Sequence, residues 1–194
     1  SKALSKRPDL MADVGSIIVG EPTSNMAIFG HKGALWLKGA CKGVTAHGSS
    51  PELGENAVYK ACNAINKLQN YDFNYLNHNE SGVPTLNLGR ISGGLNTNSV
   101  PDYAEFELDI RSLPSQNHET IISELKKLLG ESVNLEKIID LPGVQSDTNS
   151  PWAENVQKSS IRSSTHDPKT AMAKFFTDAS VLTPSLGYPP TIIL

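Results

Sequence analysis

The stretch Asp102-Tyr103-Ala104-Glu105-Phe106-Glu107-Leu108-Asp109-Ile110-Arg111 decides the fold of this chain. Its apolar residues alternate with polar and charged ones, which predicts a β-strand with one buried face and one face in water. An apolar run at residues 85–91 predicts a second strand, and the glycine-rich loop 93–101 joins the two. Such a loop is typical of a hairpin, in which glycine supplies backbone angles that other residues avoid.

The neighbouring segments extend this hairpin into a complete unit. Residues 56–68 and 115–129 carry apolar side chains at helical spacing, and Gly130 is placed to end the second helix. Residues 34–43 and 133–139 read as further strands. The resulting order is strand, helix, strand, strand, helix, strand. We therefore predict a ferredoxin-like (βαββαβ) α+β unit.

The segments on either side of this unit alternate between strand and helix patterns. Short strands are expected at residues 11–20 and 170–176, and helices at 151–163 and from Asp178, after a linker at 141–150. This alternation is typical of an α/β domain. We expect the ferredoxin-like unit to be inserted between two partial strips of one such domain, and the chain to be an internal piece of a larger protein.

Composition excludes several classes of function. The chain has 194 residues, a net charge of -3 and 38% hydrophobic residues, so it has no strongly basic surface for nucleic acid or anionic membranes. No apolar run approaches the roughly 20 residues that a membrane span requires. We expect a cytoplasmic protein in which Cys41 and Cys62 are two buried thiols, with a disulfide as the alternative.

Four features could carry chemistry. Glu21 follows a predicted strand, where open α/β sheets place ligands, although it could be a solvated turn carboxylate. His47 lies in a loop of small residues, as a functional or a merely solvated histidine. The loop 93–101 offers amides for substrate oxygens. Arg111 stands on the polar face of its strand, either as a carboxylate clamp or in a cross-strand ion pair with Glu105, Glu107 or Asp109.

Taken together, these features match a known order. They occur along the chain as Gly20-Glu21-Pro22-Thr23, Ala46-His47-Gly48 with Asn56-Ala57, Gly94 with Asn98-Ser99-Val100-Pro101, Asp109-Ile110-Arg111, and Phe176-Thr177-Asp178-Ala179-Ser180. This order resembles the di-zinc hydrolase family of acetylornithine deacetylase, succinyl-diaminopimelate desuccinylase, aminoacylase and glutamate carboxypeptidase. The stretch Pro84-Thr85-Leu86-Asn87-Leu88-Gly89 is most similar to the two deacylases.

The resemblance implies a role for each matching residue. Glu21 would be a zinc ligand, and His47 a lid histidine that reaches the partner subunit's site and stabilises the oxyanion. Asn98, Arg111, Lys32 and Thr177 match substrate-binding positions, the arginine being aimed at a carboxylate. Asp178 lies in the same loop as Thr177, although it could equally be a helix N-cap.

The resemblance also implies a domain division and a partner. Residues 1–30 and 142–194 would be partial catalytic α/β segments, and residues 31–141 a lid and dimerisation domain. The parent enzyme would bind two zinc ions, or cobalt, per active site. It would act as a homodimer.

The same resemblance shows what cannot be placed. The upstream His-x-Asp motif, the bridging aspartate, the Glu-Glu pair with the general base and a final histidine ligand have no counterpart here. We therefore expect the chain alone to be inactive, because one glutamate cannot hold two zinc ions.

The sequence thus predicts part of a zinc-dependent amidohydrolase of amino-acid biosynthesis that deacylates N-acyl amino acids. A metallo-carboxypeptidase or dipeptidase of the same family, and a non-catalytic association module, are the alternatives. A free-standing small-molecule sensor fits less well, because it leaves the segments around Glu21 and Thr177 without a purpose.

Overall fold

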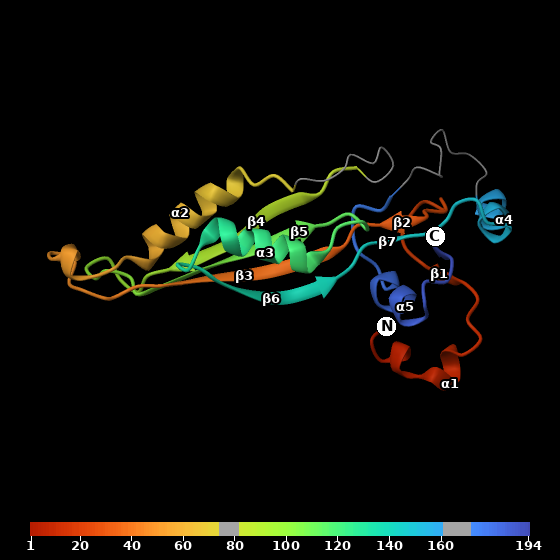
Figure 1. The fold of residues 1–194 in the computed structure, drawn as a ribbon, viewed down its shortest axis with the longest axis horizontal. Coiled ribbons are helices and arrows are strands. Elements are labelled where there is room, and N and C mark those ends of the chain that lie inside the picture. Colours follow the sequence, from red (N-terminus) through yellow and green to blue (C-terminus); the bar gives the residue numbers. More distant parts are fainter. Residues whose placement is uncertain (74–81, 161–171) are drawn as a thin grey trace.

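The computed structural model describes residues 1–73, 82–160 and 172–194. It is elongated, with a long sheet and two helices at one end and a smaller α/β part at the other (Figure 1). No helix among these residues is long and apolar enough to cross a membrane.

The long end is one four-stranded sheet, hereafter the sheet unit. All neighbouring strands are antiparallel, in the order β4-β5-β3-β6. The elements follow the predicted order: β3 (Ala34–Lys42), α2 (Ala57–Gln69), β4 (Thr85–Gly93), β5 (Tyr103–Arg111), α3 (His118–Leu129) and β6 (Asn134–Leu141). A short 3-10 turn, η2 (Pro51–Leu53), stands before α2.

The alternation in β5 explains how the two faces of the sheet differ. Its apolar residues are buried beneath α2 and α3, which lie on the same side of the sheet (Figure 1). Its charged residues lie on the other face, which we call the open face. Three ion pairs lie on this face: Lys38–Glu105, Arg90–Glu107 and Arg111–Asp109.

Both helices of the sheet unit begin at an asparagine. The Asn56 side chain accepts a hydrogen bond from the Tyr59 amide, and that of Asn117 accepts from Glu119 and Thr120. Because such a cap satisfies amides that lack an intrahelical partner, α3 starts at residue 118 and not at the predicted 115. Gly130 ends α3 with φ 71°, as predicted.

The smaller part has a mixed α/β character and pairs its strands two by two. Strand β1 (Ile17–Val19) is parallel to β8 (Thr191–Ile193), and β2 (Gly30–His31) is antiparallel to β7 (Val144–Gln145). Where the structure describes this part, four helical elements accompany the strands: η1 (Leu4–Lys6), α1 (Pro8–Met11), α4 (Pro151–Ser160) and α5 (Ala179–Ser185).

Several sequence predictions need correction here. The strand expected at 11–20 is confined to β1, because residues 8–11 form α1. The linker 141–150 contains β7. Within the strand expected at 170–176, residues 172–176 contribute only the bridge between Ala173 and His31. Residues 74–81 and 170–171, and the end of the helix expected at 151–163, lie outside the described residues.

The two cysteines are both free, but only one is buried. Cys41 points into the core of the sheet unit, whereas Cys62 is exposed on α2. The prediction of two buried thiols is therefore wrong for Cys62. The buried stripe of α2 runs instead through alanine and leucine, at Ala57, Ala61, Ala64 and Leu68.

Candidate functional site

The predicted site residues fall into two groups at opposite ends of the sheet unit. Glu21, Lys32, Arg111 and Thr177 lie in or beside the joint between the sheet unit and the smaller part, hereafter the joint. The second group lies at the far tip of the sheet unit.

At the joint, Glu21 follows directly after β1 and lines a crevice of about 450 Å³. Its amide donates to the Leu194 carbonyl at 2.6 Å, and its own carbonyl accepts from the Thr23 amide at 2.7 Å. The backbone is therefore fixed at both sides of the residue. The side chain stays partly exposed, so its carboxylate is available to a ligand in the crevice.

Two further predicted residues line the same crevice. Thr177 is buried, and its Oγ1 accepts from the Ala179 amide at 3.1 Å. Asp178 stands at the N-cap position of α5 but makes no capping hydrogen bond with its side chain. The Asp178 carboxylate is therefore not held in place by capping α5. Glu21 and Asp178 thus both line the crevice.

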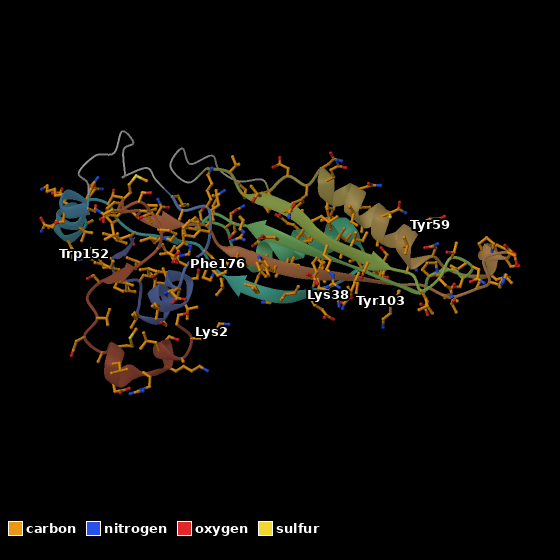
Figure 2. The ribbon with its side chains drawn as sticks, turned by 180° about the vertical axis from the view of Figure 1, so that it is seen from behind. Lys2, Lys38, Tyr59, Tyr103, Trp152 and Phe176 are labelled. Atoms are coloured by element: carbon orange, nitrogen blue, oxygen red, sulfur yellow. The ribbon has the colours of Figure 1, made fainter. Side chains whose placement is uncertain are left out.

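Arg111 lies at the joint end of β5, on the open face. Its Nε donates to Asp109 Oδ1 at 2.8 Å and its Nη2 to Asp109 Oδ2 at 2.9 Å. The guanidinium carbon lies 5.6 Å from the ring centre of Phe176, which Figure 2 places at the joint. The indole of Trp36 donates to the same Asp109 carboxylate at 3.0 Å.

This arrangement leaves one side of the guanidinium unused. Nη1 of Arg111 is buried and has no hydrogen-bond partner among the described residues. A buried donor without a partner is costly, roughly 1–3 kcal/mol. The ion pair with Asp109 forms, but within β5 and not between strands as predicted, and it leaves Nη1 of Arg111 without a partner in the described part of the chain. An oxyanion of a ligand could occupy the remaining side.

Lys32 is engaged differently. Its side chain is almost fully buried, and Nζ donates to the Val83 carbonyl at the start of β4. Burial, with the nearby charge of Lys174, lowers the pKa of the Lys32 amine. To touch a substrate the amine would have to leave the Val83 carbonyl.

His47 and Asn98 come together at the tip. The amide of Gly48 donates to the Asn98 carbonyl at 2.7 Å, and His47 forms a bridge with Ser99. The His47 ring is exposed, and Nδ1 accepts from the Ser49 amide at 3.2 Å. This contact leaves Nε2 as the ring nitrogen that can meet another molecule.

The two groups cannot act together within one chain. Strand β3 runs from the joint to the tip over nine residues, which at about 3.3 Å each corresponds to roughly 30 Å. In Figure 1 the start of α2 lies toward the end of the molecule that is opposite the joint. A reaction that needs both groups must therefore take His47 from a second molecule.

The described residues do not by themselves fit a complete metal site. No three His, Cys, Asp or Glu side chains converge within the described ranges. Carboxylate oxygens are suitable zinc donors, so Glu21 fits as one ligand, but a zinc site takes three or four. A site that includes Glu21 would need donors from elsewhere.

Sequence reasoning missed the residues that hold Arg111. Trp36 carried no signal, and Asp109 was weighed only as an ion-pair partner. Phe176 opens the motif of residues 176–180, and the resemblance assigns no role to it. The alternation of β5 could have placed Asp109 beside Arg111, because residues two apart share a face. Nothing in the sequence brings Phe176 to them.

The sequence of this chain matches a known protein family. The family model for the peptidase dimerisation domain of M20 enzymes matches residues 29–134, more than half of the chain. The chain belongs to this M20 family. The match covers nearly all of the sheet unit together with strand β2.

Curated relatives carry the names of amide-cleaving enzymes. A probable succinyl-diaminopimelate desuccinylase of Staphylococcus epidermidis is 27% identical over 176 residues, covering 75% of this chain and 43% of the relative. An acetylornithine deacetylase of Vibrio atlanticus is 34% identical over 119 residues, covering 59% and 32%. A probable carboxypeptidase of Talaromyces marneffei is 35% identical over 127 residues, covering 62% and 28%. The chain spans less than half the length of each.

Solved structures share the fold. The dipeptidase Dug1p of Saccharomyces cerevisiae matches all of this chain and 55% of its own, with a TM-score of 0.72 and 11% identity. An M20 family metallo-carboxypeptidase of Sulfolobus solfataricus matches 99% and 58%, with a TM-score of 0.68 and 16% identity. At such identities the likeness concerns the fold alone. It includes the smaller part as well as the sheet unit.

Proposed function

We propose that this chain is part of a metal-dependent amidohydrolase that deacylates N-acyl amino acids, of the acetylornithine deacetylase or succinyl-diaminopimelate desuccinylase type. The observation that carries the proposal is Arg111. Its guanidinium is fixed by Asp109 and Phe176, and its buried Nη1 has no partner among the described residues. It stands at the joint, where the crevice holding Glu21 also lies.

The chemistry of such substrates fits this arrangement. Every N-acyl amino acid carries a carboxylate at a fixed distance from its scissile amide. A guanidinium already oriented by other groups binds that carboxylate with little further ordering, which is the advantage of arginine over lysine. Thr177, Lys32 and Asn98 are proposed as further substrate contacts. For Lys32, the hydrogen bond to the Val83 carbonyl would have to break, whereas the Thr177 hydroxyl can donate while it accepts from the Ala179 amide.

We propose that the enzyme binds two metal ions and that Glu21 contributes to their site. Glu21 would be one ligand of a two-zinc or two-cobalt site, completed by residues outside this chain. The short coverage of the relatives and the lack of a three-donor cluster in the described ranges support this. When bound, such a pair of metals polarises the scissile carbonyl and generates hydroxide near neutral pH.

The proposed protein is a homodimer in which each tip serves the partner's site. His47 would donate from Nε2 to the oxyanion, with Asn98 beside it. The separation of roughly 30 Å between tip and joint supports a contribution from the second subunit, estimated from the strand rise. The name of the matching domain, peptidase dimerisation, supports the same assembly.

The features of the β4 edge favour it as the dimer contact. This edge strand carries a single charge, at Arg90, and an exposed apolar side chain, Ile91, and the exposed Leu95 follows it in the chain. The other edge, β6, carries Glu136, Lys137 and Asp140. Charged edge strands resist pairing with another chain, so β4 is the better candidate.

The proposal also divides the chain into one inserted domain and two flanking segments. Residues 31–141 would form a ferredoxin-like lid inserted between catalytic segments 1–30 and 142–194. The strand order β4-β5-β3-β6 and the two chain crossings at the joint support this division. A cytoplasmic location and a role in amino-acid biosynthesis remain predictions.

An activity assay tests the proposal. The full-length protein that carries this chain, loaded with zinc or cobalt, should hydrolyse N-acetylornithine or N-succinyl-diaminopimelate, and Arg111→Ala should lower kcat/KM by roughly 10- to 150-fold, the value of a charged hydrogen bond. The 194-residue chain alone should be silent. Turnover by the short chain, or full activity of Arg111→Ala, would contradict the proposal.

A second candidate rests on the β4 edge. The unpaired, weakly charged strand would serve a protein whose only task is association. Dimerisation of a full-length protein that never turns over acylated amino acids or peptides would favour this candidate. Turnover of dipeptides instead of N-acyl amino acids would favour a metallo-carboxypeptidase or dipeptidase.

A further inference from the structure

A chain of hydrogen bonds runs beneath the joint end of the sheet. Ser112 Oγ lies 2.7 Å from His118 Nε2, and His118 Nδ1 lies 2.7 Å from Asp140 Oδ1. Asp140 Oδ2 in turn accepts from Lys137 Nζ at 3.0 Å. We call the first three residues the brace. They come from the end of β5, the start of α3 and the end of β6, so three elements meet in it.

The direction of the hydrogen bonds follows from Asp140. Burial raises the pKa of its carboxyl, but the bonds from His118 and Lys137 outweigh burial and hold the pKa below its ordinary value. The carboxylate is therefore an acceptor, and Nδ1 of His118 carries the proton. Nε2, on the other side of the ring, is the atom that meets the Ser112 hydroxyl.

This order of serine, histidine and aspartate is that of a hydrolase triad, but the setting excludes nucleophilic chemistry. Ser112 has no exposed surface at all. Its hydroxyl packs against Gly33 so closely that a side chain at that glycine would collide with it. A nucleophile must reach a substrate carbonyl, and this hydroxyl reaches only protein.

The brace stands where the chain crosses between the two parts. The amide of Gly33 donates to the Ser112 carbonyl at 3.0 Å, so the residue that enters the sheet unit is tied to the brace. At the return crossing, a Cβ on Gly143 would lie 3.0 Å from Gly33 N and from Pro114 N. Because both crossings and the end of β5 are packed without space for side chains, a shift of one moves the others.

We propose that Ser112 and His118 are positioning residues that fix the direction of Arg111. Ser112 follows Arg111 directly, and the two side chains lie on opposite faces of the sheet. Ser112 points to α3 on the covered face, whereas Arg111 points to Phe176 on the open face. The hydrogen bond between Ser112 and His118 thus fixes the backbone at the end of β5. The fixed backbone in turn sets the direction in which the Arg111 guanidinium crosses the joint.

A buried hydrogen-bond network can fix the end of β5 in one position more narrowly than apolar packing can. Apolar packing alone tolerates small slides of a strand end, whereas a hydrogen-bonded side chain between two partners accepts only a narrow geometry. Asp109 and Phe176 hold the guanidinium, and the brace holds the backbone that carries it. The consequence for function rests on the role proposed above for Arg111, but the positional effect does not.

The first experiment measures Arg111 itself in the 194-residue chain. Its Nε–Hε cross-peak, assigned by its loss in Arg111→Lys, reports the bond to Asp109. In Ser112→Ala and His118→Asn we expect the peak to shift and its hydrogen to exchange about fivefold faster or more, the factor that a lost bond of about 1 kcal/mol implies. Ser112→Ala only removes a hydroxyl, so it keeps the fold should His118→Asn fail to fold.

A matched control separates position from stability. Tyr71→Phe removes the 2.7 Å bond from Tyr71 to Glu124, which holds the same helix α3 six residues beyond His118. It should lower the melting temperature comparably and leave the Arg111 peak unchanged. His118→Gln, whose amide can still reach Ser112, should restore the peak better than His118→Asn. An equal effect of Tyr71→Phe and Ser112→Ala on the peak would overturn the proposal.

The second experiment uses the full-length protein. Ser112→Ala should raise KM for N-acetylornithine roughly five- to tenfold and change kcat less than about twofold, the pattern of a lost binding contact. An unchanged KM would refute positioning in catalysis. If the wild-type protein turns over no acylated amino acid, the proposed function fails, while the NMR result still decides whether the brace positions Arg111.

Discussion

The sheet unit and the smaller part of this molecule are built in opposite ways. The sheet unit buries one large core between one face of a four-stranded sheet and two helices, with Leu35, Phe106 and Leu125 fully enclosed. The smaller part has two small clusters and strands that pair only two by two among the described residues.

The difference shows where each part obtains its stability. The strands and helices of the sheet unit all lie within residues 34–141 and share one large core. In the smaller part, Ile17 pairs with Thr191, near opposite ends of the chain. Closing such a long loop costs entropy that few buried contacts repay. We therefore expect the sheet unit to fold without the smaller part, but not the reverse.

The largest expected effect is on the core of the sheet unit. Phe106→Ala should lower the free energy of unfolding by about 3–5 kcal/mol, because it leaves a cavity under both helices. Ile192→Ala, equally buried but in a small cluster, should cost nearer 2 kcal/mol. Urea denaturation gives both values. Hydrogen exchange should rise throughout the chain in the first variant and only in the smaller part in the second. Loss of protection in β5 of Ile192→Ala would break the comparison.

The next effect concerns the two ends of the proposed site. In the full-length protein, His47→Ala should lower kcat roughly 100- to 1,000-fold, the usual loss of an oxyanion donor. Glu21→Ala should be inactive. Mixing the two inactive dimers and allowing exchange should restore about a quarter of the wild-type activity, because half of the dimers then contain one complete site.

A third variant controls this mixing experiment. Arg111→Ala mixed with Glu21→Ala should not recover, because the proposal assigns Arg111 and Glu21 to the site of the same chain. Continued inactivity of the His47→Ala and Glu21→Ala mixture would show that the tip does not serve the partner.

A smaller effect distinguishes the two edges of the sheet. Ile91 and Ile138 are 49% and 48% exposed, one on β4 and the other on β6. Ile91→Lys should weaken dimerisation of the chain at least about tenfold, because the charge would be buried without a partner. Ile138→Lys should not. Sedimentation equilibrium measures both. The opposite ranking would place the dimer contact on β6.

The smallest expected effect is chemical and needs no mutation. Burial raises the pKa of the Cys41 thiol, so at a given pH less of it is the reactive thiolate. Cys62 should react with a thiol reagent at once in the native chain, and Cys41 only as the sheet unit unfolds. The rate for Cys41 should rise in Phe106→Ala. Equal rates for the two thiols in the native protein would contradict the placement of Cys41 in the core.

The sheet unit could be predicted from sequence with little loss. Its strands and helices appear within a few residues of the expected bounds, because alternation and helical spacing record which face is buried. The smaller part was predicted less well. Strand β1 and the bridge at Ala173 are short, and their partners lie far away in the sequence, so no local pattern marks their ends.

The sequence alone determined the family, the element order of the sheet unit, and the residue types at Glu21, His47 and Arg111. These follow from local pattern and motif order. Only the tertiary structure placed His47 at the far end from Glu21, set Phe176 and Asp109 around the guanidinium, and joined Ser112, His118 and Asp140 beneath it. Such neighbours meet through packing across several elements, and nothing in their spacing along the chain records that they touch.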